Sequence, residues 1–290
     1  MANVKELKKK IKSTKSTLKT TTAMKLVSAA KLARSQERIT NLKPYAKELE
    51  KTIATASALT INYKHTFFNS NPENKQAYLL VISANKGLCG SYNSGLAKTI
   101  HKFIAENSDT NFKLFYIGKK VRDVIEDQYN SEKTFAFDKS EPSFDEIRKV
   151  ADELSHAFTT GEVGKVYIAY NIFNSAISFT PTVHQVLPMG ASEDDVEKLK
   201  KDFPFDFKYE PSPESILNTL IPEVYINTVY TAMLDAIAAE HGSRMAAMEN
   251  ATKNSKEMIR KLTLKANKLR QAAITTELIE VVSGAESLNG

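Results

Sequence analysis

Both ends of this 290-residue chain lack the residues that interrupt helices. The first sixty residues contain no glycine and a single proline, Pro44. From Pro222 to Ser283 there is no second proline and only one glycine, Gly242. Because glycine and proline are the residues least compatible with a helix interior, the two ends are predicted to be long helices, with a kink at Pro44. A helix over residues 222–283 would be about 90 Å long.

Other scarcities limit the class of protein. A single cysteine, Cys89, excludes an internal disulfide and fits a reducing compartment. No run of eighteen apolar residues is present, so no membrane span is expected. The N-terminus lacks the apolar core of a secretory signal, and its lysine-rich helical pattern is interpreted as mature structure.

Patterns that would indicate a catalytic or metal site are also missing. The five histidines are scattered, and none forms a pair four residues apart. The loop from Gly87 to Gly90 reads only G-x-x-G, which is neither a dinucleotide fingerprint nor a nucleotide P-loop. No histidine lies near Cys89 in the sequence, which favours a buried structural thiol. We therefore expect no active site, no cofactor and no metal.

The terminal helices each carry an apolar stripe at helical spacing. Such a narrow stripe on a long helix requires a partner helix, and the simplest arrangement pairs the two ends antiparallel as a coiled coil. The C-terminal stripe averages close to 3.6 residues per turn, which predicts weaker supercoiling than a strict heptad repeat. The stripe residues are, at the N-terminus, Val4, Leu7, Ile11, Leu18, Met24 and Val27, then Leu42, Ala46, Leu49, Ile53 and Ala56; at the C-terminus they are Ile226, Tyr230, Met233, Ile237, Met248, Ala251, Met258, Leu262, Ala266, Leu269 and Ala273.

Charge is distributed unevenly along the chain. Residues 1–60 carry fourteen basic and four acidic side chains, whereas residues 61–240 carry eighteen basic and twenty-five acidic ones. A basic helical end implies an acidic partner surface, either nucleic acid or a carboxylate-rich protein. A solvated helix face is the alternative explanation of the same charge run.

The middle of the chain predicts a small α/β domain, because strand and helix patterns alternate there. Expected strands are 77–83, 112–117, 134–137, 165–173, 179–187 and 203–209, with the 165–173 and 179–187 pair forming a hairpin. Expected helices are 91–106, 119–127 and 144–159, the last capped by Ser143. The predicted fold class is α/β plus long helices: an antiparallel coiled coil of the terminal helices with a small Rossmann-like domain between them. The expected domains are residues 1–60, 61–212 and 213–290.

The chain resembles one family over nearly its whole length, and three sequence blocks carry the resemblance. They are TAMKLVSAAK at 22–31, KGLCGSYN at 86–93, and RQAAITTE at 270–277, supported by SRMAAM at 243–248. These blocks are similar to the gamma subunit of the rotary F-type ATP synthase. Asn85 departs from the family pattern, which usually has an acidic residue there.

The resemblance implies a central rotor shaft without catalysis of its own. The shaft would couple proton flow through the membrane sector to ATP synthesis or hydrolysis in a ring of alpha and beta subunits. Other implied partners are the epsilon subunit and the ring of c subunits, and the implied location is the cytoplasmic face of the bacterial plasma membrane, peripherally attached. Residues implied to contact beta subunits are Met24, Lys25, Arg244, Gln271, Thr275 and Glu277; Tyr209 and Glu210 are implied to contact the membrane ring and epsilon.

Two other functions compete with this one. A nucleic-acid-binding protein with a basic coiled-coil arm would explain the charge, but residues 1–60 favour Lys over Arg by twelve to two and contain few aromatics. A small α/β enzyme would need a paired nucleophile and base, which the sequence does not indicate.

Overall fold

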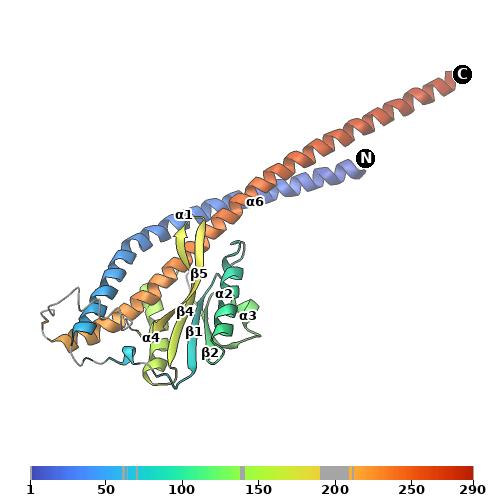
Figure 1. Cartoon of the computed structure of the whole chain (residues 1–290). Helices are drawn as coiled ribbons and strands as arrows, with labels where there is room; N and C mark the ends of the chain where they lie inside the picture. The colour runs from blue at the N-terminus through green and yellow to red at the C-terminus, as the bar shows by residue number, and fades with distance from the viewer. Residues whose placement is uncertain are drawn as a thin grey trace. The chain divides into compact units, whose positions relative to one another are not determined.

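Two very long helices dominate the structure, a computed structural model that describes residues 2–60, 63, 65–69, 71–137, 141–189, 209–210 and 212–289. Helix α1 spans Ala2–Leu59 and α6 spans Pro213–Asn289 (Figure 1). The 77 residues of α6 correspond to about 115 Å of helix. The prediction of long terminal helices is confirmed, and α6 begins before Pro222, which lies inside it. Pro44 also lies inside α1, which Figure 1 shows to be bent within residues 29–59.

The chain divides into two compact units. Residues 1–28 and 244–290 form one unit, which we call the shaft pair, and residues 29–243 form the other, which we call the body. Each long helix therefore contributes one stretch to each unit. The division into three domains at residues 60 and 212 remains a prediction.

The body contains a five-stranded sheet in the order β3-β2-β1-β4-β5. Strands β1 to β4 are parallel neighbours, and β5 pairs antiparallel with β4, which confirms the predicted hairpin. This mixed sheet with the two long helices confirms the predicted fold class. The strand bounds are Gln76–Ile82 (β1), Asn111–Ile117 (β2), Asn130–Phe135 (β3), Lys165–Ser175 (β4) and Ser178–Leu187 (β5).

Short helices complete the body: η1 (Thr66–Phe68), α2 (Tyr92–Glu106), α3 (Arg122–Ile125) and α4 (Phe144–Thr159). Ser143 caps α4 as predicted, and Glu146 completes a capping box. Helix α3 is shorter than predicted, because the chain turns after Gly118, whose φ is +90°, and residues 119–121 belong to that turn. The predicted strand 203–209 lies outside the described residues, apart from Tyr209.

The sheet is covered on both faces. Alternate residues of β1 point to opposite sides: Tyr78, Leu80 and Ile82 join a core with α4 and α6, whereas Leu79 and Val81 join a second core with α2. Figure 1 shows α4 on one side of the sheet and α2 and α3 on the other. Helix α6 is therefore part of the larger core of the body, not an appendage to it.

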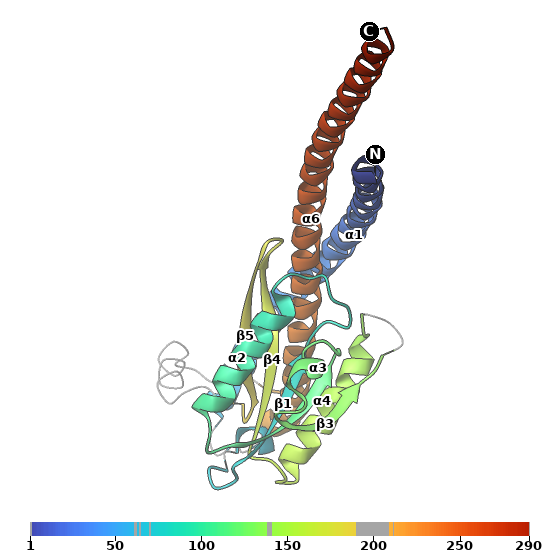
Figure 2. The same cartoon turned by 90° about the vertical axis from the view of Figure 1, so that its right-hand side faces the viewer.

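Helix α6 and the β4–β5 hairpin approach each other closely at Gly242. A Cβ added at Gly242 would lie 2.9 Å from the backbone oxygen of Ala176, at the turn of the β4–β5 hairpin. Figure 2 shows this hairpin running alongside α6. Gly242 thus permits a close backbone contact between α6 and the hairpin.

The G-x-x-G loop also packs on α6. Cys89 is buried, as predicted, and its carbonyl accepts a hydrogen bond from Ser243 Oγ at 2.5 Å. At the start of α2, Tyr92 Oη donates to the carbonyl of Ala236 at 3.0 Å. Two further polar contacts thus fix α6 to the body next to Gly242.

Candidate partner-binding surface of the shaft

The two helices of the shaft pair run antiparallel. Three side-chain contacts join them: Thr14 Oγ1 to Met258 Sδ at 4.0 Å, Thr21 Oγ1 to Thr252 Oγ1 at 2.9 Å, and Lys25 Nζ to Glu249 Oε2 at 2.6 Å. Residue numbers rise along α1 while they fall along α6, which confirms the predicted antiparallel coiled coil.

The seam of α1 repeats every seven residues and is rich in hydroxyl groups. Thr14, Thr21, Ser28 and Ser35 follow one another at this interval, and all four are buried or half-buried. Thr21 and Ser35 also donate to carbonyls of their own helix, Leu18 and Lys31. The complete series are Val4, Ile11, Leu18, Lys25, Leu32, Ile39, Ala46 and Ile53, and Leu7, Thr14, Thr21, Ser28, Ser35, Leu42, Leu49 and Ala56.

Two residues of the predicted apolar stripe are exposed. Val27 is 58% exposed and lies off the seam, whereas Met258 is 54% exposed and lies at its margin, where its sulfur still contacts Thr14. Small hydroxyl residues replace them, because a heptad repeat decides which positions face the partner and a Thr or Ser fits there when its hydroxyl is bonded. Along residues 248–273 the buried and half-buried positions alternate by four and three, an average close to the predicted 3.6 residues per turn: Met248, Thr252, Ser255, Ile259, Leu262, Ala266, Leu269 and Ala273.

The first group of predicted contact residues lies around the Lys25–Glu249 pair. Met24 and Lys25 are half-buried neighbours on α1, and Arg244 is buried at 8% exposure. Lys25 occupies a seam position of the heptad, and its ammonium lowers the pKa of Glu249 through a hydrogen bond and its charge. Sequence reasoning missed Glu249, because only the register of the two helices identifies it.

The second group lies about 40 Å further along α6. Gln271, Thr275 and Glu277 are all exposed. Thr275 Oγ1 donates to the carbonyl of Gln271 at 3.0 Å, so these two residues share one face of the helix. The structure therefore places the six predicted shaft residues in two separate groups rather than at one site.

The two residues predicted to meet the membrane ring lie in the body. Tyr209 is half-buried, with its hydroxyl 3.3 Å from Thr60 Oγ1, and it packs against the larger core. Glu210 is exposed. Of these two residues, Glu210 has the more accessible side chain.

The outer surface of the shaft pair is basic. Residues 1–28 and 244–290 carry sixteen Lys and Arg but six Asp and Glu. All of these cations except Lys25 and Arg244 are exposed. Short-range pairs occupy some of them, such as Lys10 with Glu6 and Lys261 with Glu257. The remaining excess of positive charge would attract an acidic partner surface.

The C-terminal part of α6 exposes apolar side chains that sequence reasoning did not single out. Leu278, Val281 and Val282 are 60–70% exposed, and every residue from 274 to 285 is exposed. The antiparallel register explains this exposure. Lys25 meets Glu249, so α1, whose helix begins at Ala2, reaches no further than about residue 273 of α6. Large exposed apolar side chains in succession are typical of a surface that binds a partner.

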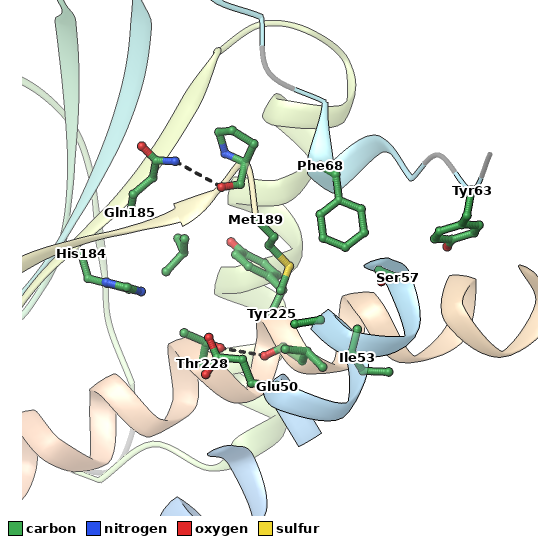
Figure 3. Close-up of a pocket in the computed structure, with 14 residues that line it drawn as sticks. Glu50, Ile53, Ser57, Tyr63, Phe68, His184, Gln185, Met189, Tyr225 and Thr228 are labelled. Carbon is green, nitrogen blue, oxygen red and sulfur yellow. Dashed lines mark hydrogen bonds between the residues drawn. The ribbon is translucent and has the colours of Figure 1, made fainter. Parts of the chain in front are cut away.

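The body contains a cavity of about 680 Å³ (Figure 3). Its lining comes from α1, η1, α6, the end of β5 and the residues that follow β5, with an apolar wall that includes Phe68, Met189 and Tyr225. Ser57 and His184 lie at opposite sides of it in Figure 3. The cavity residues drawn there do not bring a serine and a histidine together as nucleophile and base.

Two other kinds of site, a metal centre and a membrane span, are absent from the described ranges. No group of three or more His, Cys, Asp or Glu residues is arranged to hold a metal ion in this part of the chain. None of the described helices is long and apolar enough to cross a membrane.

Comparison with known proteins identifies the family. The family model for ATP synthase matches residues 3–288. The gamma chain from an Anaeromyxobacter species is 40% identical over 99% of this chain and all of the relative. The gamma chain from Bdellovibrio bacteriovorus is 39% identical over the full length of both.

The chain belongs to the ATP synthase gamma chain family.

Solved structures agree with this assignment. The central stalk and c-ring structure of the Tetrahymena thermophila mitochondrial ATP synthase contains a chain that is 26% identical, with a TM-score of 0.57 over 80% of this chain and 98% of that one. A rotor chain of the Euglena gracilis enzyme shares the fold at 19% identity, with a TM-score of 0.65 over 94% of this chain and 99% of that one. The nucleic-acid-binding alternative gains no support from these comparisons.

Proposed function

We propose that this chain is the central rotor shaft of a proton-translocating F-type ATP synthase, and that it transmits torque between the membrane sector and the catalytic ring. The observation that carries the proposal is the antiparallel shaft pair with a basic exterior and an exposed apolar end. Membership of the gamma chain family over residues 3–288 supports the same function.

The proposed partners of the shaft pair are the alpha and beta subunits, and its two features suit two kinds of contact. Exposed lysines such as Lys8 and Lys253 suit carboxylate-rich levers on the beta subunits, although each exposed ion pair contributes only about 1 kcal/mol or less. The apolar residues around Leu278 and Val281 suit an apolar surface on the surrounding ring of alpha and beta subunits, where burial contributes about 25 cal/mol per Å². Shape and apolar packing therefore transmit most of the force, while charge guides the fit.

We assign each of the predicted contact residues to one of these partners. Met24, Lys25 and Arg244 would contact beta subunits near the body, and Gln271, Thr275 and Glu277 would do so near the exposed end of α6. Tyr209 and Glu210 would face the epsilon subunit and the ring of c subunits, with Glu210 supplying the accessible carboxylate. The chain itself would carry no active site, no cofactor and no metal, and catalysis would remain in the beta subunits.

The proposed location is the cytoplasmic face of the bacterial plasma membrane, where the chain would be held peripherally by its partners. The proposed domain division assigns residues 1–60 and 213–290 to the shaft and residues 61–212 to a foot at the membrane end.

Reconstitution tests the function directly. The purified chain alone is expected to hydrolyse no ATP, whereas adding it to alpha and beta subunits should give hydrolysis accompanied by rotation of a probe attached to the body. Gln271→Ala should lower the number of probe rotations per ATP hydrolysed. Asn254→Ala, which changes another exposed amide on α6, should leave this number unchanged. ATP hydrolysis by the isolated chain, or hydrolysis by the complex without rotation, would contradict the proposal.

A further inference from the structure

Asp235 is a buried carboxylate inside the body, at the point where the sheet, α1 and α6 meet. Its side chain is 5% exposed, yet it lies on a helix whose neighbouring residues Met233, Ala236 and Ile237 belong to the larger core. Burial of a carboxylate in such a place is costly unless charged or hydrogen-bonding partners compensate. Its retention therefore calls for an explanation beyond packing.

Two partners from different elements compensate this carboxylate. Lys43 Nζ of α1 lies 2.7 Å from Asp235 Oδ1, and the backbone N–H of Phe173 in β4 donates a hydrogen bond to the same carboxylate. Asp235 itself belongs to α6, so one side chain connects both long helices with the central sheet. Its charge also reaches Tyr170 of β4, where burial first and this carboxylate second raise the pKa to about 12.

The two long helices are held within the body in different ways. Helix α6 enters the larger core with many apolar residues, from Leu217 to Ile237. Helix α1 contributes Ile53 and Ala56 to the buried set of that core, and Leu32 and Ile39 of α1 are buried outside it. Ion pairs also join the stretch 29–48 of α1 to other elements of the body, and two of them are Lys43 with Asp235 and Arg38 with Glu141. Arg38 is 54% exposed, which leaves Lys43–Asp235 as the better shielded link.

We propose that Asp235 and Lys43 form a torque-bearing joint that makes both shaft helices turn together with the body. This inference rests on the proposed rotor function. Helix α6 alone would transmit torque through its own core contacts, but α1 would follow it only as far as the seam and this joint hold the two together. The backbone contact at Phe173 fixes the joint to the sheet, so Asp235 acts as a positioning residue rather than a catalytic one.

The test compares coupling with stability in the complete enzyme. Lys43→Gln removes the cation while leaving Asp235 in place; burial already raises the pKa of that carboxyl, so a proton can take the place of the lysine and the fold should survive. Asp235→Asn removes the charge but keeps an oxygen that accepts from Phe173. Lys43→Asp combined with Asp235→Lys restores the ion pair between the helices. Lys133→Gln, which breaks the surface pair with Glu153, is the control.

Three measurements are made on each variant: thermal melting of the isolated chain, ATP hydrolysis with alpha and beta subunits, and protons pumped per ATP after assembly with the membrane sector in vesicles. We expect Lys43→Gln and Asp235→Asn to retain hydrolysis but to pump about threefold to tenfold fewer protons per ATP. The reversed pair should recover part of this loss, and Lys133→Gln should match the wild type.

Unchanged pumping per ATP in a folded Lys43→Gln variant would overturn the joint, and so would a loss of pumping of the same size in Lys133→Gln. If Asp235→Asn fails to fold, Lys43→Gln decides the question. Failure of the rotor function itself would appear differently, because the wild-type chain would then not support hydrolysis with rotation in the presence of alpha and beta subunits.

Discussion

Lys25 Nζ lies 2.6 Å from Glu249 Oε2, although the two residues are 224 positions apart in the chain. The lysine occupies a seam position of the α1 heptad where an apolar residue is usual, so it reaches across to α6 with its ammonium half-shielded. A polar residue at such a position fixes the register of two helices, which is how this pair aligns the shaft.

The first prediction concerns the titration of Glu249. The hydrogen bond from Lys25 and then its charge lower the pKa of the Glu249 carboxyl below 4.5, its ordinary value. Because the folded pKa is depressed, the stabilisation by this pair is present above pH 4.5 and is lost as the pH falls through the lowered pKa. Lys25→Met should return the pKa of Glu249 towards 4.5, and Lys25→Arg should keep it low. Carboxyl-resolved NMR titration measures both, and an equal pKa in the two variants would contradict the pairing.

The second prediction concerns the hydrogen bond that Thr252 Oγ1 donates to Thr21 Oγ1 at 2.9 Å within the seam. Thr21→Val leaves the buried Thr252 hydroxyl without this acceptor and should destabilise the shaft pair by about 1 kcal/mol. Changing both residues to Val removes donor and acceptor together at nearly constant volume and should be close to neutral.

Amide hydrogen exchange over residues 4–28 measures the shaft pair separately from the body. Thr22→Val is the control, because Thr22 is half-buried and bonds the carbonyl of Leu18 in its own helix. A double variant that loses as much protection as the sum of the single variants would show that the two hydroxyls do not interact.

The scarcity of glycine and proline was enough to predict both long helices, because helix breakers act locally and their absence is visible in the sequence. The uninterrupted apolar run at residues 77–82 indicates a strand buried on both faces, and the sheet is covered on both. The seam was only partly predictable. Val27 and Met258 are apolar at nearly suitable spacing, yet they are exposed, while Thr21 and Ser28 are buried. Residue type indicated the stripe, but the facing helix decided its position.

The candidate surface shows the same limit. The motif blocks located Lys25, Gln271 and Thr275, but their separation into two groups follows from the length of α6. Glu249 could not be predicted from its neighbours, since its importance comes from a register set by residues at the other end of the chain. The exposure of Leu278 could have been predicted by aligning the two helices and noting that α1 ends first.

The third prediction concerns the contact between α6 and the β4–β5 hairpin. Gly242→Ala would place a Cβ 2.9 Å from the Ala176 carbonyl oxygen, so the hairpin or the helix must shift. We expect destabilisation of the body by about 1–3 kcal/mol, the usual cost of overpacking. Gly284→Ala is the matched control, because nothing lies within 4 Å of a Cβ there and alanine favours a helix by up to about 1 kcal/mol. Denaturant unfolding of both variants measures the difference, and an unchanged midpoint for Gly242→Ala would refute the close contact.

The fourth prediction uses two leucines two residues apart on α6. Leu262 is half-buried in the seam, whereas Leu264 is 61% exposed. Leu262→Asp would place a carboxylate against the apolar side chains of α1, which should weaken the shaft pair by about 2 kcal/mol or more. Leu264→Asp makes the same chemical change on the outer face and should leave the pairing intact in the isolated chain. Hydrogen exchange in residues 4–18 of α1 measures the result, since these amides are on the other helix and report the pairing rather than the local helix around the substitution. Equal protection of residues 4–18 in the two variants would mean that Leu262 does not face α1, and the heptad assignment of residues 248–273 would then be wrong.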